Sequence, residues 1–451
     1  MAAQTEKLSD PGRAWAAYEP GGDRPWNLAL AGHLYRRAAF GASWDQLKQA
    51  LWDGPQRTVD KLLRPEGDIE EFNRAHDDYE AATGSIEQLQ AWWLRRMIQS
   101  PHPLAEKMTL FWHGHFATNA EKVKNARLMQ QHVGLLRAQA LGSFRILLHG
   151  IIKDPAVLLW LGAEANRKAQ PNDDLARALM ETFTLGPENC TDGDIKAASR
   201  ALTGWFVLRG KLRYIAREHD NGEKQILGRK GNFSRDDVTR IILEEPATSR
   251  RLVQRLYRWL ISETAEPDEA LICPLAEAFA KDYDVLKLVE TMLRSNLFFS
   301  AAAYRRRVKS PVDFALGIVK ALETTVSTTQ LANDLADLGQ NLYHPPTVNG
   351  WIGGRHWINS AAIVGRDNLA WAMLRGSDPY GKKLNPWAVA QRHGCSTFES
   401  ASRFVLDLLL QGDVDPSICD KLIQTAQEGD MEVRMRRFTH AAVTLPEFHL
   451  A

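Results

Sequence analysis

The stretch "QPNDDLARALMETFTLGP", residues 170–187, carries the helical pattern that recurs along most of the chain. Asn172 is a favourable N-cap, and the acids after it lie in the first turn, where the helix dipole favours negative charge. Gly186 followed by Pro187 ends the helix. Apolar residues recur every four positions and predict one buried face: Leu175, Leu179 and Phe183.

The opposite face of this predicted helix carries Asp173, Arg177 and Glu181, again at a spacing of four. One interpretation is an exposed ion ladder, which stabilises a helix by about 0.2–0.5 kcal/mol per pair. The other places this face against a cavity, where Glu181 serves as general acid or base. Arg177 then binds negative charge or shifts the pKa of Glu181, and Asp173 contacts the substrate. The sequence leaves both interpretations open.

Outward from this stretch the helical period dominates, and we predict a mainly α fold: a large multi-helix single unit with a small inserted β-hairpin. Residues 1–25 are polar and predict a loose N-terminal arm. A helical region over 26–245 carries the main motifs, and a second helical region follows over 246–451. Later helices are predicted at about 235–244, 247–261, 267–281, 284–295, 310–323, 328–340, 361–375, 397–411 and 415–427.

A β-leaning segment interrupts the helices at about 205–228. Asp220-Asn221-Gly222 separates its two extended runs. Asn-Gly is a strong hairpin signal because both positions tolerate positive φ. We therefore expect one two-stranded ribbon with this turn at its tip.

Four side chains of the expected ribbon are candidates for chemistry. His219 and Asp220 are capable of proton transfer and are candidate catalytic residues. Lys224 and Trp205 are candidate contacts to a substrate. The competing interpretation makes Asp220 only a turn residue.

The motif "FWHGHF", residues 111–116, contains two histidines two positions apart. At helical pitch such residues point about 200° apart. His113 and His115 could therefore share a metal ion only if Gly114 ended the helix. A buried, hydrogen-bonded His115 is the competing interpretation, and a catalytic His115 beside the central helix is a third.

The segment "YHPPTVNGWIGGRHWIN", residues 343–359, combines Pro, Gly and Trp and predicts a structured loop. Trp351, Arg355 and Trp357 suit stacking on a sugar and capture of an anion. The same tryptophans could instead pin the loop to the core. We keep both interpretations of this loop.

Composition limits the class of protein. The 451 residues carry a formal net charge of +1 with 44% hydrophobic residues, as in soluble globular proteins. This charge gives no argument for nucleic acid or a membrane surface as partner, and no stretch has the roughly 20 apolar residues of a membrane span. The four scattered cysteines indicate neither a disulfide framework nor a zinc site. The first residues lack an apolar signal core, so we expect a cytoplasmic protein unless a leader has been trimmed, in which case it is exported.

Several of these segments form a series along nearly the whole chain: "HLYRRAAFG" (33–41), "FWHGHF" (111–116), "DPAVLLWL" (154–161), "PNDDLARALMETFTLG" (171–186), "ASRALTGW" (198–205), "EHDNGEKQILG" (218–228), "VKSPVDF" (308–314) and "PPTVNGWIGGRHWI" (345–358). In this order they resemble a bacterial family catalogued as domain of unknown function 1800. The resemblance implies a family whose members are often larger and often look exported. Their genes commonly neighbour a second uncharacterised family that resembles sulfatases, which points to polysaccharide or sulfated substrates.

The chain departs from the family's usual central helix, which reads closer to Asn-Glu-Asn-Tyr-Ala-Arg-Glu-Leu-Met-Glu. Asp173 and Asp174 stand where the family has its first Glu and its second Asn. Leu175 replaces the Tyr, and Ala178 replaces the second Glu. After "DPAVLLWL" the family usually has an acid, where this chain has Gly162. A catalytic carboxylate lost at one of these positions would make this chain a weakened or altered member. The resemblance gives weight to the positions that do match: Arg177, Glu181, His219 and Asp220.

These observations lead to one preferred hypothesis and two rivals. We expect a hydrolase-like enzyme that acts on carbohydrate or another polyhydroxylated anionic substrate, with Glu181 as acid or base in a helical cleft. The first rival is a non-enzymatic scaffold that binds polysaccharide or protein. The second is a metal-assisted hydrolase that uses His113 or His115. The sequence identifies no cofactor; the expected partners are a polysaccharide or sulfated sugar and the product of a neighbouring sulfatase-like gene.

Overall fold

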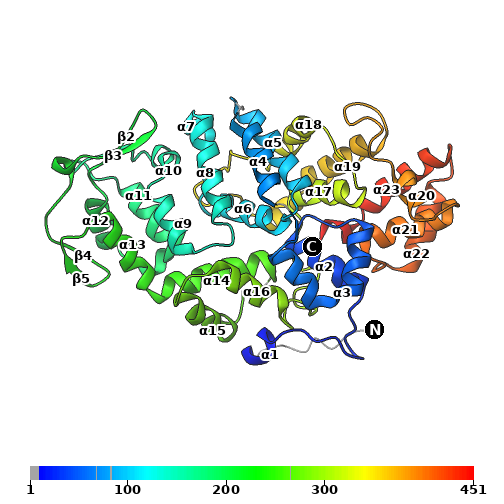
Figure 1. Cartoon of the computed structure of the whole chain (residues 1–451), viewed down its shortest axis with the longest axis horizontal. Helices are drawn as coiled ribbons and strands as arrows, with labels where there is room; N and C mark the ends of the chain where they lie inside the picture. Colours follow the sequence, from blue (N-terminus) through cyan, green and yellow to red (C-terminus); the bar gives the residue numbers. More distant parts are fainter. Residues whose placement is uncertain (1–9, 68, 82–83, 265) are drawn as a thin grey trace.

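The computed structural model describes residues 10–67, 69–81, 84–264 and 266–451, which form 23 α-helices (Figure 1). The strands are few and short, so the fold is mainly α, as predicted. The later helices predicted from the sequence are confirmed to within a few residues at each end, whereas two further helices, at Pro386–Arg392 and Met431–Val443, were not predicted. None of the helices in the described ranges combines the length and the apolar character that crossing a bilayer requires.

The N-terminal elements are α1 (Pro11–Trp15), α2 (Leu28–Ala38), α3 (Trp44–Leu63), α4 (Ile69–Ala81), α5 (Ile86–Gln99), α6 (Pro103–His115), α7 (Ala120–Val123), α8 (Ala126–Ala138), α9 (Phe144–Ile151) and α10 (Pro155–Trp160). The central elements are β1 (Ala165–Asn166), α11 (Asp173–Arg177), η1 (Ala178–Thr184), η2 (Pro187–Asn189), α12 (Asp192–Ala201), β2 (Trp205–Leu208), β3 (Lys211–Tyr214), η3 (Ala216–Glu218), β4 (Lys224–Ile226) and β5 (Arg229–Gly231). The C-terminal elements are α13 (Arg235–Glu244), α14 (Pro246–Leu260), α15 (Glu269–Ala280), α16 (Val285–Arg294), α17 (Pro311–Ala321), α18 (Thr328–Asp337), η4 (Gly354–Ile358), α19 (Ser360–Leu374), α20 (Pro386–Arg392), α21 (Phe398–Leu410), α22 (Pro416–Thr425), α23 (Met431–Val443) and η5 (Pro446–His449).

Two hydrophobic clusters form the core. The first joins α6, α9, η1, α13, α14 and α16, and the second joins α5, α17, α21 and α23. Helices α2 and α6 contribute buried residues to both clusters, so the two clusters adjoin. Ile242 and Leu252 lie on either side of the boundary expected at 245–246, yet they belong to the same cluster. No break in the core therefore marks that boundary.

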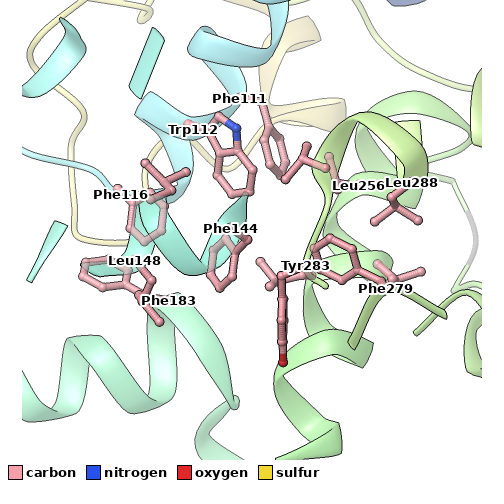
Figure 2. Packing of buried hydrophobic residues seen from close by; sticks show 14 of the residues in the cluster. Phe111, Trp112, Phe116, Phe144, Leu148, Phe183, Leu256, Phe279, Tyr283 and Leu288 are labelled. Atoms are coloured by element: carbon pink, nitrogen blue, oxygen red, sulfur yellow. The ribbon is translucent and has the colours of Figure 1, made fainter. Parts of the chain in front are cut away.

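A group of aromatic rings fixes α6 against η1 and α9 (Figure 2). The ring centroids of Trp112 and Phe116 lie 5.7 Å apart, and those of Phe116 and Phe183 lie 5.1 Å apart. Phe144 and Tyr283 extend the group toward α16, with centroids 5.9 Å apart. Aromatic pairs of this kind each contribute about 0.5–1.5 kcal/mol beyond their buried area. The end of α6 is consequently held in one position.

The segment before α2 packs against the body of the protein. The side chain of Tyr18 is buried, and its hydroxyl donates to the carbonyl oxygen of Arg24 at 2.7 Å. The indole N–H of Trp15 donates to the carbonyl oxygen of Leu271 on α15 at 2.8 Å. The arm expected to be loose therefore packs through Trp15 and Tyr18, whereas residues 19–25 are exposed and residues 1–9 lie outside the described part of the chain.

The β-leaning segment contains two hairpins where we expected one. Strands β2 and β3 pair antiparallel, with β1 beside β2, and β4 pairs with β5. The turns are Arg209-Gly210 and Leu227-Gly228, in which both residues have positive φ. Trp205 begins β2, and the guanidinium carbon of Arg235 lies 3.5 Å from the centroid of one of its rings.

The turn predicted at Asp220-Asn221-Gly222 was wrong. These residues connect η3 to β4 and do not join two paired strands. The Asp220 carboxylate accepts from the backbone N–H of Gly222 at 2.8 Å, which is a local turn that Asp forms with its own backbone. His219 and Asp220 therefore lie in a connecting loop, not at a hairpin tip.

The last residues of the chain pair with the segment before α17. Val308 forms an antiparallel bridge with Leu450, and the backbone N–H of Lys309 donates to His449 O at 2.8 Å. The backbone N–H of Ala451 donates to Arg307 O at 2.7 Å. These bonds fix the segment 307–309, whose side chains enter two different cavities described below.

Candidate functional site, an arginine and tryptophan cavity

The stretch 170–187 forms α11 and then, without a break, the π-helix η1. The backbone N–H of Leu185 donates to Met180 O, five residues earlier, at 2.8 Å. The hydroxyl of Thr184 donates to Leu179 O at 2.6 Å. Such π-turns are rare in proteins overall, and those that occur lie frequently at functional sites. The predicted apolar face is confirmed as buried: Leu175, Leu179 and Phe183.

The charged face of this helix is paired at the surface. Arg177 has a side chain that is 46% exposed, and it donates to Glu181 at 2.6 Å and to Asp192 at 3.0 Å. Asp173 is exposed. Neither Arg177 nor Glu181 lines the arginine cavity or the polar cavity, which are described below, or a further cavity of about 540 Å³ between α3 and α17. One pair of the predicted ion ladder, Arg177 with Glu181, is therefore present, and Asp192 rather than Asp173 is the second partner of Arg177.

The candidates from the β-leaning segment also have partners close by in the chain. Arg200 donates to both carboxylate oxygens of Asp220, at 2.7 and 3.1 Å, and these bonds lower the pKa of Asp220 to about 2. His219 Nδ1 lies 3.0 Å from the carbonyl oxygen of Thr203. The Lys224 ammonium is buried and donates to Asp220 O at 2.5 Å. These groups form a closed polar network, and none of them lines the two large cavities.

The two histidines of α6 face different partners. The helix continues through Gly114 to His115, so the two imidazoles lie on different sides of it. His113 Nε2 accepts from the backbone N–H of Tyr343 at 3.1 Å, and His115 Nε2 lies 3.0 Å from Phe183 O. Both rings are buried, and burial is the main cause that holds their pKa values well below the usual range. The geometry offers them no common position for a metal ion.

One group of side chains elsewhere in the fold has the spacing of metal ligands. Within the described ranges, three acidic or imidazole side chains place one ligand atom each within 4.8 Å of the others: Asp45, Glu323 and His393. Lys48 already lies 2.8 Å from Asp45, and Arg392 lies 3.0 Å from Glu323. Because two cations compensate these carboxylates, the group does not favour a metal-assisted enzyme either.

Helix α14, which lies at the lower centre of Figure 1, has two faces of opposite character. One face is apolar and buried: Leu252, Val253, Leu256, Tyr257 and Leu260. The other carries Arg251, Arg255 and Arg258 at spacings of four and three, followed by Trp259. The helix sequence contains neither Asp nor Glu, so no acid one turn away within α14 neutralises these arginines.

Arg255 is the least compensated of these arginines. No described residue supplies its guanidinium with a hydrogen bond or an ion pair. Burial, and then the charges of Arg251 and Arg258, lower the pKa of Arg255 to about 10. Arg258 pairs with Glu266 at the outer end of the face, whereas Nε of Arg251 is buried and has no acceptor in the described structure.

Arg307 adds a fourth guanidinium from the segment before α17. Its side chain is 4% exposed, and its guanidinium carbon lies 3.7 Å from the centroid of one of the Trp259 rings. Nη2 lies 3.7 Å from Asp313, and Nη1 is buried without an acceptor among the described residues. A stacked arginine with an open donor is typical of sites that bind anions.

The loop 343–359 forms the facing wall. Gly350 has a φ of 73°, and a Cβ atom on it would lie 2.1 Å from the carbonyl oxygen of Gly114, so only glycine fits against the end of α6. Trp357 is buried and Trp351 is half-buried, and both line the cavity. The loop is structured, and its tryptophans both anchor it and face the cavity. Arg355 is exposed and does not line the cavity.

These walls enclose a cavity of about 490 Å³, which we call the arginine cavity. Its floor is the last turn of α6, and its single carboxylate is Glu263, which accepts from the backbone N–H of Val308 at 2.5 Å. The complete lining is Leu110, Phe111, Gly114, Arg251, Gln254, Arg255, Arg258, Trp259, Glu263, Arg307, Ser310, Gln340, Asn349, Trp351, Ile352, Gly353 and Trp357.

A second cavity, of about 930 Å³, lies among α4, α5, α6 and α8, and we call it the polar cavity. Its central charge is Glu106, which is buried and accepts from Arg96 at 2.5 Å, from Arg137 at 3.1 Å and from the indole of Trp93 at 3.0 Å. Two of the three arginines that line this cavity, Arg96 and Arg137, thus pair with its carboxylate, and the third, Arg127, is exposed. The arginine cavity is therefore the better candidate for a ligand site.

The pattern of the family described as "Protein of unknown function (DUF1800)" matches residues 33–450. The chain belongs to this family. The match includes α6, α14 and the loop 343–359, so the whole arginine cavity lies in the part shared with the DUF1800 family. Comparisons with curated proteins and with solved structures returned no match.

Sequence reasoning found the loop of this DUF1800 protein and the helix opposite to it, at 247–261, but not the arginine face of that helix. The signal was present in "RRLVQRLYRW", residues 250–259, as arginines at helical spacing without intervening acids. His115 is the only catalytic candidate that approaches this face, since Arg255 contributes to lowering its pKa. Arg307 had no signal, because its place in the cavity depends on how distant segments pack.

Proposed function

We propose that this DUF1800 protein binds an anionic carbohydrate, or another polyhydroxylated anion, in the arginine cavity. The observation that carries the proposal is the charge of the lining, which has four arginines against one carboxylate. Arginine presents a planar fork of donors that matches sulfate, carboxylate and phosphate oxygens. A bound anion would supply acceptors for Arg255 and for Nη1 of Arg307, which have none among the described residues.

The rest of the lining supports a ligand that is flat and rich in hydroxyl groups. Trp351 and Trp357 offer faces on which a sugar ring stacks, and their amphipathic rings tolerate a partly wet cavity. Gln254, Asn349 and Ser310 offer donors and acceptors for hydroxyl groups. The volume of about 490 Å³ falls in the range of about 300–1,000 Å³ that is usual for small-molecule sites.

Binding fits this cavity better than glycoside hydrolysis. The usual glycosidase mechanisms need two carboxyl groups about 5–9.5 Å apart, one on each side of the bond that is cleaved. The lining supplies one carboxylate, Glu263. Glu181, the acid or base of our hydrolase hypothesis, pairs with Arg177 outside this cavity. We therefore propose recognition as the function and keep the anionic carbohydrate as the ligand class.

Isothermal titration calorimetry tests the proposal with a matched set of oligosaccharides that share one backbone and are sulfated, carboxylated or neutral. We expect the two anionic forms to bind and the neutral form to bind at least 10-fold more weakly. Trp351→Ala should weaken binding by about 5- to 100-fold, because stacking on an aromatic ring contributes about 1–3 kcal/mol. Equal affinity for the neutral form, or no binding by any form, contradicts the proposal.

Two controls make this experiment specific. Trp52→Ala removes a tryptophan that is 87% exposed and does not line the cavity, and it should leave the affinity unchanged. Incubation with the same sugars, followed by an assay for reducing ends, tests for hydrolysis. Release of reducing ends that stops in Glu263→Gln would replace recognition by catalysis as the function of this cavity.

A further inference from the structure

A third, much smaller cavity lies between α2, α17 and α21, and we call it the lysine cavity. Its volume is about 20 Å³, which is room for one particle of about the size of a water molecule. Its polar lining comes from Arg36, Lys309, Asp313 and Gln411, and the remaining side chains are mainly apolar. Nothing in the proposed function involves this cavity.

Lys309 is buried in this cavity without a counter-ion. Its side chain lines the cavity, and the residue is only 4% exposed. No described residue forms a hydrogen bond or an ion pair with its Nζ. Nζ lies 3.5 Å from the centroid of the Phe448 ring, which is a cation–π contact. In the motif "VKSPVDF", Ser310, Pro311 and Asp313 form the N-terminal cap of α17, but the cap gives no role to Lys309.

Arg36 reaches the same cavity from α2 and also has open donors. The residue is 8% exposed, and its Nη1 donates to the side-chain oxygen of Gln411. Its Nε and Nη2 are buried and form no hydrogen bond of standard geometry with a described residue, although Tyr304 and Asp413 lie close enough to act electrostatically on Arg36. Two buried cations with unused N–H groups therefore line a space that would hold a single small particle.

The charges around the cavity do not balance. Lys107 and Arg366 lie close enough to act electrostatically on Lys309, and both are buried as well. The carboxylate that acts on Lys309 is Asp313, and this group is already paired with Lys107 and lies 3.7 Å from Arg307. Unpaired buried charges are costly, and burial holds the pKa of Lys309 well below its ordinary value, so an additional negative charge would stabilise the protonated form of Lys309.

We propose that the lysine cavity binds one monatomic anion, chloride, between Lys309 and Arg36. A cavity of about 20 Å³ has no room for sulfate, phosphate or a carboxylate, whereas it accepts a single atom. The ligand would receive hydrogen bonds from Nζ of Lys309 and from Nε of Arg36. The site is structural in character, because the anion would compensate cations that the fold has brought together.

Thermal unfolding of the full chain tests the proposal. Chloride is exchanged for methanesulfonate at constant ionic strength, so that general screening stays the same. We expect the melting temperature to rise with chloride concentration, since at ten times the Kd the folded-to-unfolded ratio increases about 11-fold. Identical melting curves in the two salts would overturn the proposal.

Two variants tie the response to this cavity. A Cβ on Gly317 would lie 3.7 Å from Nζ of Lys309 and 3.6 Å from Phe40 O, which are ordinary contact distances. Gly317→Ala should therefore fold normally, fill the cavity and abolish the chloride response. Lys309→Met should abolish the response as well, while Lys211→Met, at an exposed position, should retain it. A chloride response that persists in Gly317→Ala contradicts the site.

Crystals grown in bromide locate the anion directly. We expect an anomalous difference peak between Lys309 and Arg36 in the wild-type protein and no such peak in Gly317→Ala. Bromide at other positions only, with this cavity empty or filled by a water molecule, would overturn the assignment.

Discussion

The charged face of α11 and η1 and the arginine face of α14 have nearly the same spacing and opposite charge balance. On the first, Arg177 meets Glu181 and Asp192, and it is largely solvated. On the second, Arg255 is half-buried beside two further arginines and meets no acceptor in the described structure. The comparison teaches that spacing identifies a charged helix face, whereas pairing and burial decide what that face is available for.

The energetic meaning of the two faces also differs. Exposed ion pairs contribute about 0–1 kcal/mol, and their loss leaves the fold almost unchanged. Buried cations without a partner carry a cost of desolvation, and strongly perturbed groups in cavities are characteristic of functional sites. The arginine face is therefore more informative about function than the ladder, although the ladder is easier to find in the sequence. Four substitutions test this difference.

The largest effect is expected for Gly350→Ala, which separates the loop that faces the arginines from the end of α6. The new Cβ would lie 2.1 Å from Gly114 O, and the φ of 73° is strained for alanine. We expect a loss of about 2–4 kcal/mol in the free energy of unfolding, measured with urea, together with loss of anion binding. Gly381→Ala has a similar φ of 66° but open space around its Cβ, so it should cost clearly less. Equal effects of the two substitutions would mean that the contact with α6 is unimportant.

The second effect concerns Arg255→Gln on the arginine face. Hydrogen bonds to charged groups contribute about 1.5–3 kcal/mol, so the affinity for an anionic sugar should fall about 10- to 100-fold. The free energy of unfolding should not decrease, because the variant removes a half-buried charge that has no partner among the described residues. Arg177→Gln on the paired face is the matched control and should leave the affinity unchanged. Calorimetric titrations of the two variants against one ligand decide between the faces.

The third effect concerns how the free energy of unfolding depends on pH through a second, partly exposed ion pair, Asp220 with Arg200. The pKa of Asp220 is about 2 in the folded protein, below its ordinary value of 3.8. The ion pair therefore stabilises the fold fully above pH 3.8, and this contribution is lost as the pH falls toward 2. We expect about 1 kcal/mol, because Arg200 is partly exposed and solvent weakens the pair.

The measurement for this pair is urea unfolding between pH 5 and pH 2, compared between the wild-type protein and Asp220→Asn. The difference in unfolding free energy between the two should shrink across that window. A difference that stays constant with pH would show that the carboxylate is not held in its charged form by Arg200.

The smallest effect is expected for Glu181→Gln. Its pair with Arg177 is partly solvated, so the variant should lose about 0.2–1 kcal/mol, and less at high salt. Anion binding in the arginine cavity should be unaffected. Loss of binding in this variant would restore Glu181 to the functional site and reverse our ranking of the two faces. Urea unfolding at two salt concentrations and one calorimetric titration are sufficient.

The helices were largely predictable because their signals are local. A helix start is marked by a capping residue, such as Ser310 or Thr191, and often by a proline in the first turn. These residues lie next to one another in the chain, so the signal can be recognised in the sequence. The hairpins were harder to predict, since their turns are Arg209-Gly210 and Leu227-Gly228. These pairs lack the Asn-Gly signature, while the Asn-Gly that is present lies in a connecting loop.

The candidate site was predictable only in part, because pairing is a property of the folded chain. The tryptophans Trp351 and Trp357, in a segment rich in Pro and Gly, allowed a binding loop to be predicted from the sequence. Arg255 and Glu181 look alike in the sequence as charges on amphipathic helices. The sequence offered Glu181 a partner in Arg177 as one of two interpretations, and the structure pairs these two while it leaves Arg255 without a partner in the described ranges.

The segment 307–309 connects the two proposed anion sites. Arg307 lines the arginine cavity and Lys309 lines the lysine cavity, and the carboxylate of Asp313 acts on both cations. An anion in one cavity repels an anion in the other, and linkage requires each to weaken the other's affinity by the same factor. On the two proposals, the salinity of the surroundings would therefore tune sugar capture, with the tightest binding in fresh water.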